Sequence, residues 1–121
     1  MIARGLICYL YVDDIREMRE KGYDVRAAVK SVNQAKSAIM KYEKSGVRFF
    51  IIDLDHDLGD FAYDGGDGYE LVKWLIETGR NTSDYEIICH SMNPVGKANI
   101  MQLYKRYWRV NDLIENEEDA E

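Results

Sequence analysis

The chain has 121 residues, of which 46% are hydrophobic and 31% charged, and its formal net charge is −6. This length predicts one domain with a core of modest size, and no apolar run approaches the roughly 20 residues that a membrane span needs. The sequence also lacks a broad basic stripe, so we expect no binding to long duplex nucleic acid.

Both ends of the sequence carry local signals. The start, MIARGLICYLYVDD, runs into an Asp pair without a small-residue cleavage site, which is unlike a secretory signal and favours a cytoplasmic location. Cys8 and Cys89 lie in apolar runs without metal-ligand spacing, so we expect buried, reduced thiols. Residues 115–121 hold five acids and no base. We therefore expect a domain over residues 1–114 and a solvated acidic tail over 115–121.

The first half of the chain predicts two strands, one helix and a third strand. Residues 6–12 are a continuous apolar run, typical of a strand covered on both faces. The polar stretch 15–24 has weak apolar periodicity and room for a short first helix. A short strand is expected at 27–30, followed by a helix that Ser31 caps and that ends before Gly46.

The strongest strand of the chain, 47–54, leads into an acidic, glycine-rich loop. A second helix opens at Gly68 and ends at Gly79, a strand follows at 85–90, and a third helix comes after it. A further short strand near 107–110 is weakly marked. The side chains of the third helix that we expect to point inward are Ile100, Met101, Tyr104, Tyr107 and Trp108.

Strands that alternate with helices in this way predict an α/β fold with right-handed crossovers and a parallel sheet. Ligands of such sheets bind beyond the carboxyl ends of the strands. Asp13 and Asp14 follow the first strand, Asp55 to Asp57 follow the third, and His90 and Ser91 follow the fourth. Three distant segments thus deliver polar groups to one edge of the sheet.

The adjacent acids Asp13 and Asp14 repel one another unless a cation or water lies between them. Mg²⁺ is well served by one or two carboxylates, a carbonyl and several waters. An Asx turn or a helix cap is the common alternative for Asp after a strand. Beside the second acidic cluster, metal binding is the better interpretation.

The segment IIDLDHDLGD invites comparison with two further acidic motifs. Asp53, Asp55 and Asp57 match the first three ligand positions of a calcium loop, but Leu58 replaces its glycine, so the EF-hand interpretation fails. A hydrophobic strand followed by Asp53-Leu54-Asp55 resembles a haloacid-dehalogenase-type phosphatase. That family carries the motif on its first strand, which leaves this interpretation second.

An alignment with receiver domains fits better. Asp55 stands at the place of the phospho-accepting Asp, and Ser91 stands where receivers carry Ser or Thr. The resemblance implies a flavodoxin-like three-layer sandwich with strand order 2-1-3-4, a fifth strand beyond the fourth if it forms, and a reduced first helix. No Lys followed by Pro closes a fifth strand, since Lys105 lies in the last helix pattern.

The motifs LYVDDIR, LDHDLGD and HSMNPVGKAN, spread over residues 6–102, closely resemble the cyclic-phosphate-processing receiver family of bacteria and their phages. The resemblance implies the processing of cyclic nucleotides or RNA 2′,3′-cyclic phosphate ends, in RNA repair or in phage–host conflict. The expected partner is then a phosphorylated small molecule, a cyclic nucleotide or an RNA end, in the cytoplasm of a bacterium or an infected cell.

The chemistry of such a reaction assigns roles to these residues. His56 and His90, the two histidines of the chain, would share acid and base work, with Asp55 beside them. A cation, Mg²⁺ or Mn²⁺, would lie on carboxylates and offset the phosphoryl charge. The candidate ligands of that cation are Asp13, Asp14, Asp55 and Asp57.

The SMNPVGK segment favours phosphate binding and also has a structural interpretation. Asn93 is a suitable N-cap, with Pro94 in the first helical position. Free amides at that helix start attract phosphate. The candidate phosphate-binding residues are Ser91, Asn93, Gly96 and Lys97.

Three questions stay open at this point. Asp53 shares a strand face with Asp55 and is placed outside the innermost set, as a paired acid. The loop 60–68 is either a flap over the site or a long turn. A non-enzymatic module, phosphorylated on Asp55 or sequestering a nucleotide, competes with the enzyme hypothesis.

Overall fold

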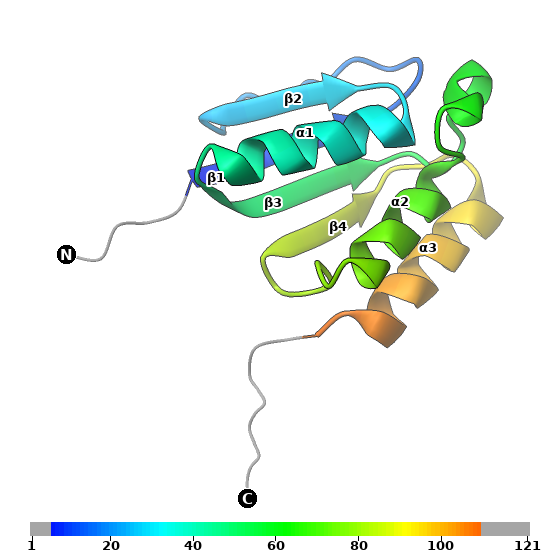
Figure 1. Ribbon diagram of the computed structural model, residues 1–121. Coiled ribbons are helices and arrows are strands. Elements are labelled where there is room, and N and C mark those ends of the chain that lie inside the picture. The colour runs from blue at the N-terminus through cyan, green and yellow to red at the C-terminus, as the bar shows by residue number, and fades with distance from the viewer. Residues whose placement is uncertain (1–5, 110–121) are drawn as a thin grey trace, which may run out of the picture.

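The computed structural model describes residues 6–109, which form a four-stranded parallel sheet with three α-helices (Figure 1). The predicted tail at 115–121 lies outside the described residues. No helix within 6–109 combines the length and the apolar character of a membrane span. The α/β class and the predicted strand order are confirmed.

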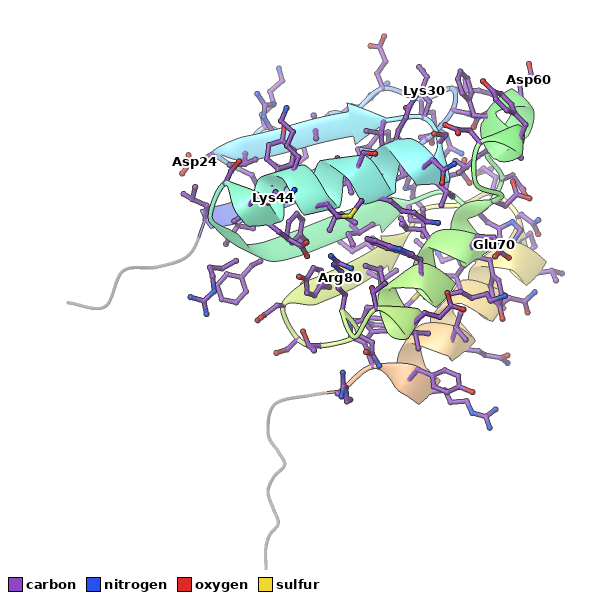
Figure 2. All side chains as sticks on the ribbon, in the orientation of Figure 1. Asp24, Lys30, Lys44, Asp60, Glu70 and Arg80 are labelled. Atoms are coloured by element: carbon purple, nitrogen blue, oxygen red, sulfur yellow. The ribbon has the colours of Figure 1, made fainter. Side chains whose placement is uncertain are left out.

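The sheet consists of β1 (Leu6–Val12), β2 (Val25–Val29), β3 (Val47–Leu54) and β4 (Tyr85–Cys89) in the order β2-β1-β3-β4. The register aligns the strand ends, because Val12 pairs with Val29 and with Leu54, and Leu54 pairs with Cys89. The next residue of every strand therefore stands at the same carboxyl edge. In Figure 2, Lys30 and Asp60 lie at this edge, and Asp24 and Lys44 lie at the opposite end.

The helices are α1 (Val32–Lys44), α2 (Gly68–Glu77) and α3 (Pro94–Tyr107). Two of the predicted caps are confirmed. The Ser31 hydroxyl accepts from the Gln34 N–H at 3.1 Å, and the Asn93 side chain accepts from the Gly96 N–H at 3.0 Å. Each cap satisfies one amide that the first helical turn leaves without a partner.

The core lies between the sheet and these helices, which cover one face of the sheet (Figure 1). Alternate strand residues point into it, as the period of two requires. The largest fully buried side chains come from β1 and β3, from all three helices and from the loop after β3. They include Leu10, Phe50, Ile52, Leu54, Ile39, Leu58, Leu71, Leu75 and Ile100.

The β1–β2 connection differs from the prediction, because residues 13–24 form bends and irregular backbone without a helix. Their weak apolar periodicity provides no stripe for a helix to bury. The connection instead packs on the second face of the sheet, where Tyr23 stacks on Tyr9 with ring centroids 5.4 Å apart. Within residues 6–109 this connection is all that represents the third layer, so Ile7, Phe49 and Ile88 remain about 40% exposed.

The chain after α3 also differs in part. Trp108 packs against the core as predicted, but Tyr107 is 44% exposed, so its inward placement was wrong. Tyr107 is the last residue of α3 and lines the cleft between α2 and α3. In place of a fifth strand, the described residues show a single parallel bridge between Thr82 and Arg109.

Candidate functional site at the carboxyl edge of the sheet

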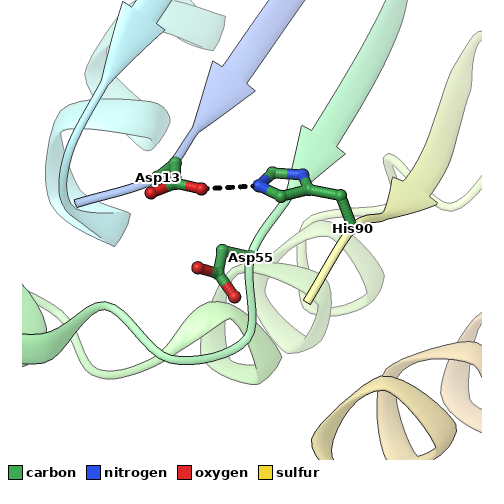
Figure 3. A group of neighbouring side chains, drawn as sticks. All are labelled: Asp13, Asp55 and His90. Carbon is green, nitrogen blue, oxygen red and sulfur yellow. Dashed lines mark hydrogen bonds and ion pairs between the residues drawn. The ribbon is translucent and has the colours of Figure 1, made fainter. Parts of the chain in front are cut away.

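The strand register brings three predicted site residues together. Asp13, Asp55 and His90 each follow a strand end, and backbone bonds extend the ladder to them: the Asp55 N–H donates to Val12 O at 2.9 Å and the His90 N–H to Leu54 O at 3.1 Å. Figure 3 shows their side chains converging from β1, β3 and β4. One ligand atom of each lies within 4.8 Å of the others. The predicted convergence is thus present in the fold.

Asp13 is buried, and both of its carboxylate oxygens have hydrogen-bond partners. Its Oδ1 accepts from the backbone N–H groups of Ile15 and Arg16 at 2.9 and 2.8 Å, which is the Asx turn considered above as the alternative to metal binding. Its Oδ2 lies 2.8 Å from His90 Nε2. Burial alone would raise the pKa of Asp13, but these hydrogen bonds and the Arg16 charge outweigh it and hold the pKa below its usual value.

His90 bridges two carboxylates. Its Nδ1 lies 2.6 Å from Asp53 Oδ1, and its ring stacks on Tyr11 at a centroid distance of 4.8 Å. Burial lowers the pKa of His90, but the two carboxylate partners, Asp53 and Asp13, reverse this effect and raise it. With both ring nitrogens facing carboxylates, His90 is an imidazolium that donates two hydrogen bonds. The role of Asp53 was left open by the sequence; in the structure Asp53 pairs with His90 and also accepts from the Tyr9 hydroxyl.

Arg16 is a site residue that the sequence interpretation missed. Its Nε lies 3.2 Å from Asp13 Oδ2 and its Nη2 lies 3.3 Å from Asp55 Oδ2, so one guanidinium spans both carboxylates. Its side chain is 44% exposed. The signal was present in the LYVDDIR motif, but the weak helical pattern after β1 gave no indication of where the side chain points.

Asp14 turns away from its neighbour and lies outside the group formed by Asp13, Asp55 and His90. Its carboxylate packs against Gly59, where φ is +52° and a Cβ would lie 2.4 Å from Asp14 Oδ2. Burial raises the pKa of Asp14, and the nearby charges of Asp13 and Asp55 raise it further. Lys30 donates to the Asp14 carbonyl at 3.1 Å, which brings a second cation to this edge.

His56 and Asp57 form a separate cluster with Asp67. His56 Nδ1 lies 2.7 Å from Asp57 Oδ1, and this hydrogen bond lowers the pKa of Asp57. The His56 ring packs on the first turn of α3, where a Cβ on Gly96 would lie 2.4 Å from His56 Cγ. Glycine is therefore required at position 96 for the ring to lie where it does.

The predicted phosphate-binding residues lie beside this second cluster, and several of their groups serve the local fold. The Ser91 hydroxyl accepts from the Asn93 N–H at 3.1 Å. Asn93 Nδ2 donates to Asp57 Oδ1 at 3.4 Å. The Lys97 side chain is exposed, and the Val95 N–H has no hydrogen-bond partner among residues 6–109. A phosphate at this helix start would therefore meet Val95 N–H and Lys97.

The two histidines open into different cavities. His90 lines a hollow of about 750 Å³ on the second face of the sheet, together with Arg16, Arg19 and Asp53. His56 lines a cleft of about 910 Å³ between α2 and α3. Asp55 lies between the two, since it precedes His56 in the chain and contacts Arg16.

The loop before α2 is held in place by side-chain hydrogen bonds. Asp64 accepts from the Ser31 hydroxyl at 2.6 Å and from Asn33 Nδ2 at 3.0 Å, and Asp67 accepts from the Leu58 N–H at 3.0 Å. A 3₁₀ turn at Gly59–Tyr63 fills its first half. These contacts favour the long-turn interpretation of the loop over the flap.

The carboxylates of Asp13 and Asp55 fit a hard divalent cation such as Mg²⁺ or Mn²⁺, which prefers oxygen ligands. Three carboxylates, those of Asp13, Asp53 and Asp55, face two cationic groups, Arg16 and His90. The cluster therefore retains a negative charge for a cation to offset. Because the Arg16 guanidinium already contacts both candidate ligands, a cation there would compete with it.

Comparison with known proteins identifies the family. The model of the cyclic-phosphate processing receiver domain matches residues 8–106, a range that includes every residue of the site. Neither the curated proteins nor the solved structures include a significant match. With most of its length matched by that model, the chain belongs to the cyclic-phosphate processing receiver domain family.

Proposed function

We propose that this protein is a metal-dependent phosphoesterase that opens a cyclic phosphate, either in a cyclic nucleotide or at an RNA 2′,3′-cyclic phosphate end. The supporting observation is the convergence of Asp13, Asp55 and His90 at one sheet edge, next to a histidine with a carboxylate partner. The family name points to the same class of substrate. RNA repair and phage–host conflict are settings in which such ends arise.

Asp13 and Asp55 would hold Mg²⁺ or Mn²⁺, which supplies positive charge to the phosphoryl oxygens when bound. Arg16, which reaches both carboxylates, could instead direct its guanidinium to the phosphate of a bound substrate. Asp14 packs against Gly59, and Asp57 is hydrogen-bonded to His56. These contacts favour supporting roles for the two acids.

His56 is the better candidate for the general base. Asp57 occupies its Nδ1, and its Nε2 has no hydrogen-bond partner among the described residues. In the proposed step, His56 takes a proton from water while the water oxygen bonds to phosphorus. One P–O ester bond breaks, its oxygen takes a proton from solvent water and leaves as a hydroxyl, and His56 returns its proton to solvent.

His90 would act as a positioning residue. Both of its nitrogens face carboxylates, so the ring holds Asp13 in place and offsets the charge of Asp53. This division of work replaces the hypothesis that both histidines face one phosphorus. It predicts that His56→Ala lowers kcat, and that His90→Gln chiefly weakens binding of the metal.

The test is turnover of 2′,3′-cyclic nucleotides with Mn²⁺ or Mg²⁺. His56→Ala should lower kcat by about 10²–10⁴-fold, the usual contribution of a general base. Asp60→Asn, an exposed acid of the same loop, is the matched control and should keep wild-type rates. Unchanged turnover in a His56→Ala and His90→Ala double variant would overturn the mechanism.

The receiver-type alternative is phosphorylation of Asp55 or sequestration of a nucleotide without turnover. Asp55 is 5% exposed and paired with Arg16, which disfavours phosphoryl transfer to it. Acetyl phosphate followed by intact-mass measurement separates the cases. A stable, acid-labile phosphate on Asp55 would favour signalling.

A further inference from the structure

We propose that the cleft between α2 and α3 is a subsite for the nucleobase of the substrate. The inference rests on the proposed function and adds to it the part of the substrate that lies beyond the phosphate. The cleft has a volume of about 910 Å³, in the range of small-molecule sites. It opens at His56, so a ligand in it can present its phosphate to the proposed base.

The α3 wall of the cleft is mostly polar, and its residues Asn99, Gln102 and Arg106 are exposed. Asn99, Gln102, Leu103 and Arg106 follow one another at spacings of three, one and three residues, which places them on one stripe of the helix. The side chains of Asn99 and Gln102 form no hydrogen bond with any residue in 6–109. Two amides, each with donors and an acceptor, are thus available to a ligand.

The opposite wall carries negative charge. Asp67 and Glu70 line the cleft from the start of α2. Glu70 also pairs with Lys73 at 3.8 Å, and Asp67 Oδ1 accepts from the Leu58 N–H, which leaves Asp67 Oδ2 without a partner among the described residues. Carboxylates repel a second phosphate but accept hydrogen bonds from ring and amino N–H groups. The cleft therefore suits an uncharged group with N–H donors, which describes a nucleobase such as guanine.

Aromatic faces distinguish this cleft from the hollow beside His90. In that hollow, Tyr11 already stacks on His90 and Tyr9 on Tyr23. In the cleft, Tyr69 lines the wall and has no ring partner among the described residues, while part of its side chain packs against the core. Base–aromatic stacking of this kind is worth about 1–3 kcal/mol per base.

The length of the cleft matches a nucleotide. Gly96, on which the His56 ring packs, and Gln102 are six residues apart on α3, which corresponds to about 9 Å. A ligand with its phosphate near His56 thus brings its base level with Gln102. Arg106 and Tyr107 close the far end of the cleft.

The experiment measures binding by calorimetry in the presence of Mn²⁺, with guanosine 3′-monophosphate and inorganic phosphate as probes. The double variant Asn99→Ala/Gln102→Ala should weaken nucleotide binding about tenfold, the loss of two hydrogen bonds. It should leave phosphate binding unchanged. Lys105→Ala, exposed on α3 outside the cleft, is the control and should bind both probes as the wild type does.

Two results would overturn the subsite: unchanged nucleotide affinity in the double variant, or an equal loss for phosphate and nucleotide. Turnover assays keep the two proposals apart. If the wild type opens cyclic phosphates but the double variant keeps its KM for them, the subsite fails and the function stands. If the double variant loses affinity for a nucleotide that the wild type never turns over, the enzyme proposal fails and the subsite stands.

Discussion

Arg16 is the residue that most alters the chemistry expected from the acidic cluster. Two carboxylates at adjacent strand ends need positive charge between them, and the guanidinium supplies it from the same turn that Asp13 caps. The cluster is thus partly neutralised before any metal binds. Metal affinity then depends on how readily this side chain leaves.

Arg16→Gln should bind Mn²⁺ more tightly than the wild type. The gain should be about thirtyfold at most, since two partly exposed ion pairs of up to about 1 kcal/mol each no longer compete. Mn²⁺ titration followed by electron paramagnetic resonance measures it. Arg19→Gln removes a charge from the same hollow without touching Asp13 and is the control. Equal or weaker affinity in Arg16→Gln would contradict competition.

Replacing Gly96 by Ala should change the stability in the opposite direction from that seen at most helical glycines. Gly→Ala inside a helix normally stabilises by about 0.5–1 kcal/mol, but a Cβ at position 96 would lie 2.4 Å from His56 Cγ. We expect Gly96→Ala to lower the free energy of unfolding by about 1–3 kcal/mol, as overpacking does. Urea denaturation gives the value.

The same substitution in a His56→Ala background supplies the control, because the ring is then absent. There Gly96→Ala should be neutral or stabilising. If Gly96→Ala stabilises the wild type equally, the packing of His56 on α3 is different from that described.

At the level of elements, the carboxylate of Glu43 links α1 to Arg80 and to Tyr85 of β4. Glu43 Oε2 accepts from Arg80 Nε at 2.7 Å and from the Tyr85 hydroxyl at 2.5 Å. The hydrogen bonds from Arg80, with help from Tyr85, outweigh burial and lower the pKa of Glu43 below its ordinary value of 4.5. The stability that this carboxylate contributes is therefore present above that value and lost as the pH falls through the folded-state pKa.

Glu43→Gln should lower the free energy of unfolding near neutral pH by about 1–2 kcal/mol, allowing for the partial exposure of the pair. The difference from the wild type should shrink as the pH is lowered below about 4. Unfolding curves across this pH range test it, with Glu77→Gln, an exposed acid of α2, as the control. A difference that grows on acidification would contradict the sign.

Sequence alone predicted the elements that bury a strong apolar pattern. The runs 6–12 and 47–54 became β1 and β3 with the same bounds, and the caps Ser31 and Asn93 begin α1 and α3. The backbone path of residues 13–24 was harder to predict, since tyrosine stacking and an Asx turn leave no periodic pattern in the sequence. Its irregular path decides where Arg16 points, so the main charge partner of the site could not be foreseen.

The separate positions of the two histidines also could not be predicted without the fold. Residues 56 and 90 both follow strand ends, which predicted one shared site. Side-chain direction alternates along a strand, however, and each loop then turns its own way. His90 therefore lies against Tyr11 and Asp53, and His56 lies against Gly96.

At the scale of the whole molecule, the helices cover one face of the sheet and leave the carboxyl edge accessible from two sides. A cation that binds only the folded state should raise Tm as its concentration increases. At 100 times Kd it adds about 2.7 kcal/mol to the free energy of unfolding. In an Asp13→Asn/Asp55→Asn variant, added Mn²⁺ should leave Tm unchanged. Asp24→Asn, at the opposite end of the sheet, should keep the full shift. An equal shift in all three proteins would place the cation elsewhere.

The central claim is that this edge opens a cyclic phosphate, and ³¹P NMR follows that bond directly. Guanosine 2′,3′-cyclic monophosphate is incubated with the wild type and Mn²⁺, and again after chelation of the metal. We expect the cyclic phosphate signal to give way to a monoester signal with Mn²⁺, and to persist after chelation or in His56→Ala. A cyclic phosphate that stays intact with the wild type and metal, or that opens equally fast in His56→Ala, would contradict it.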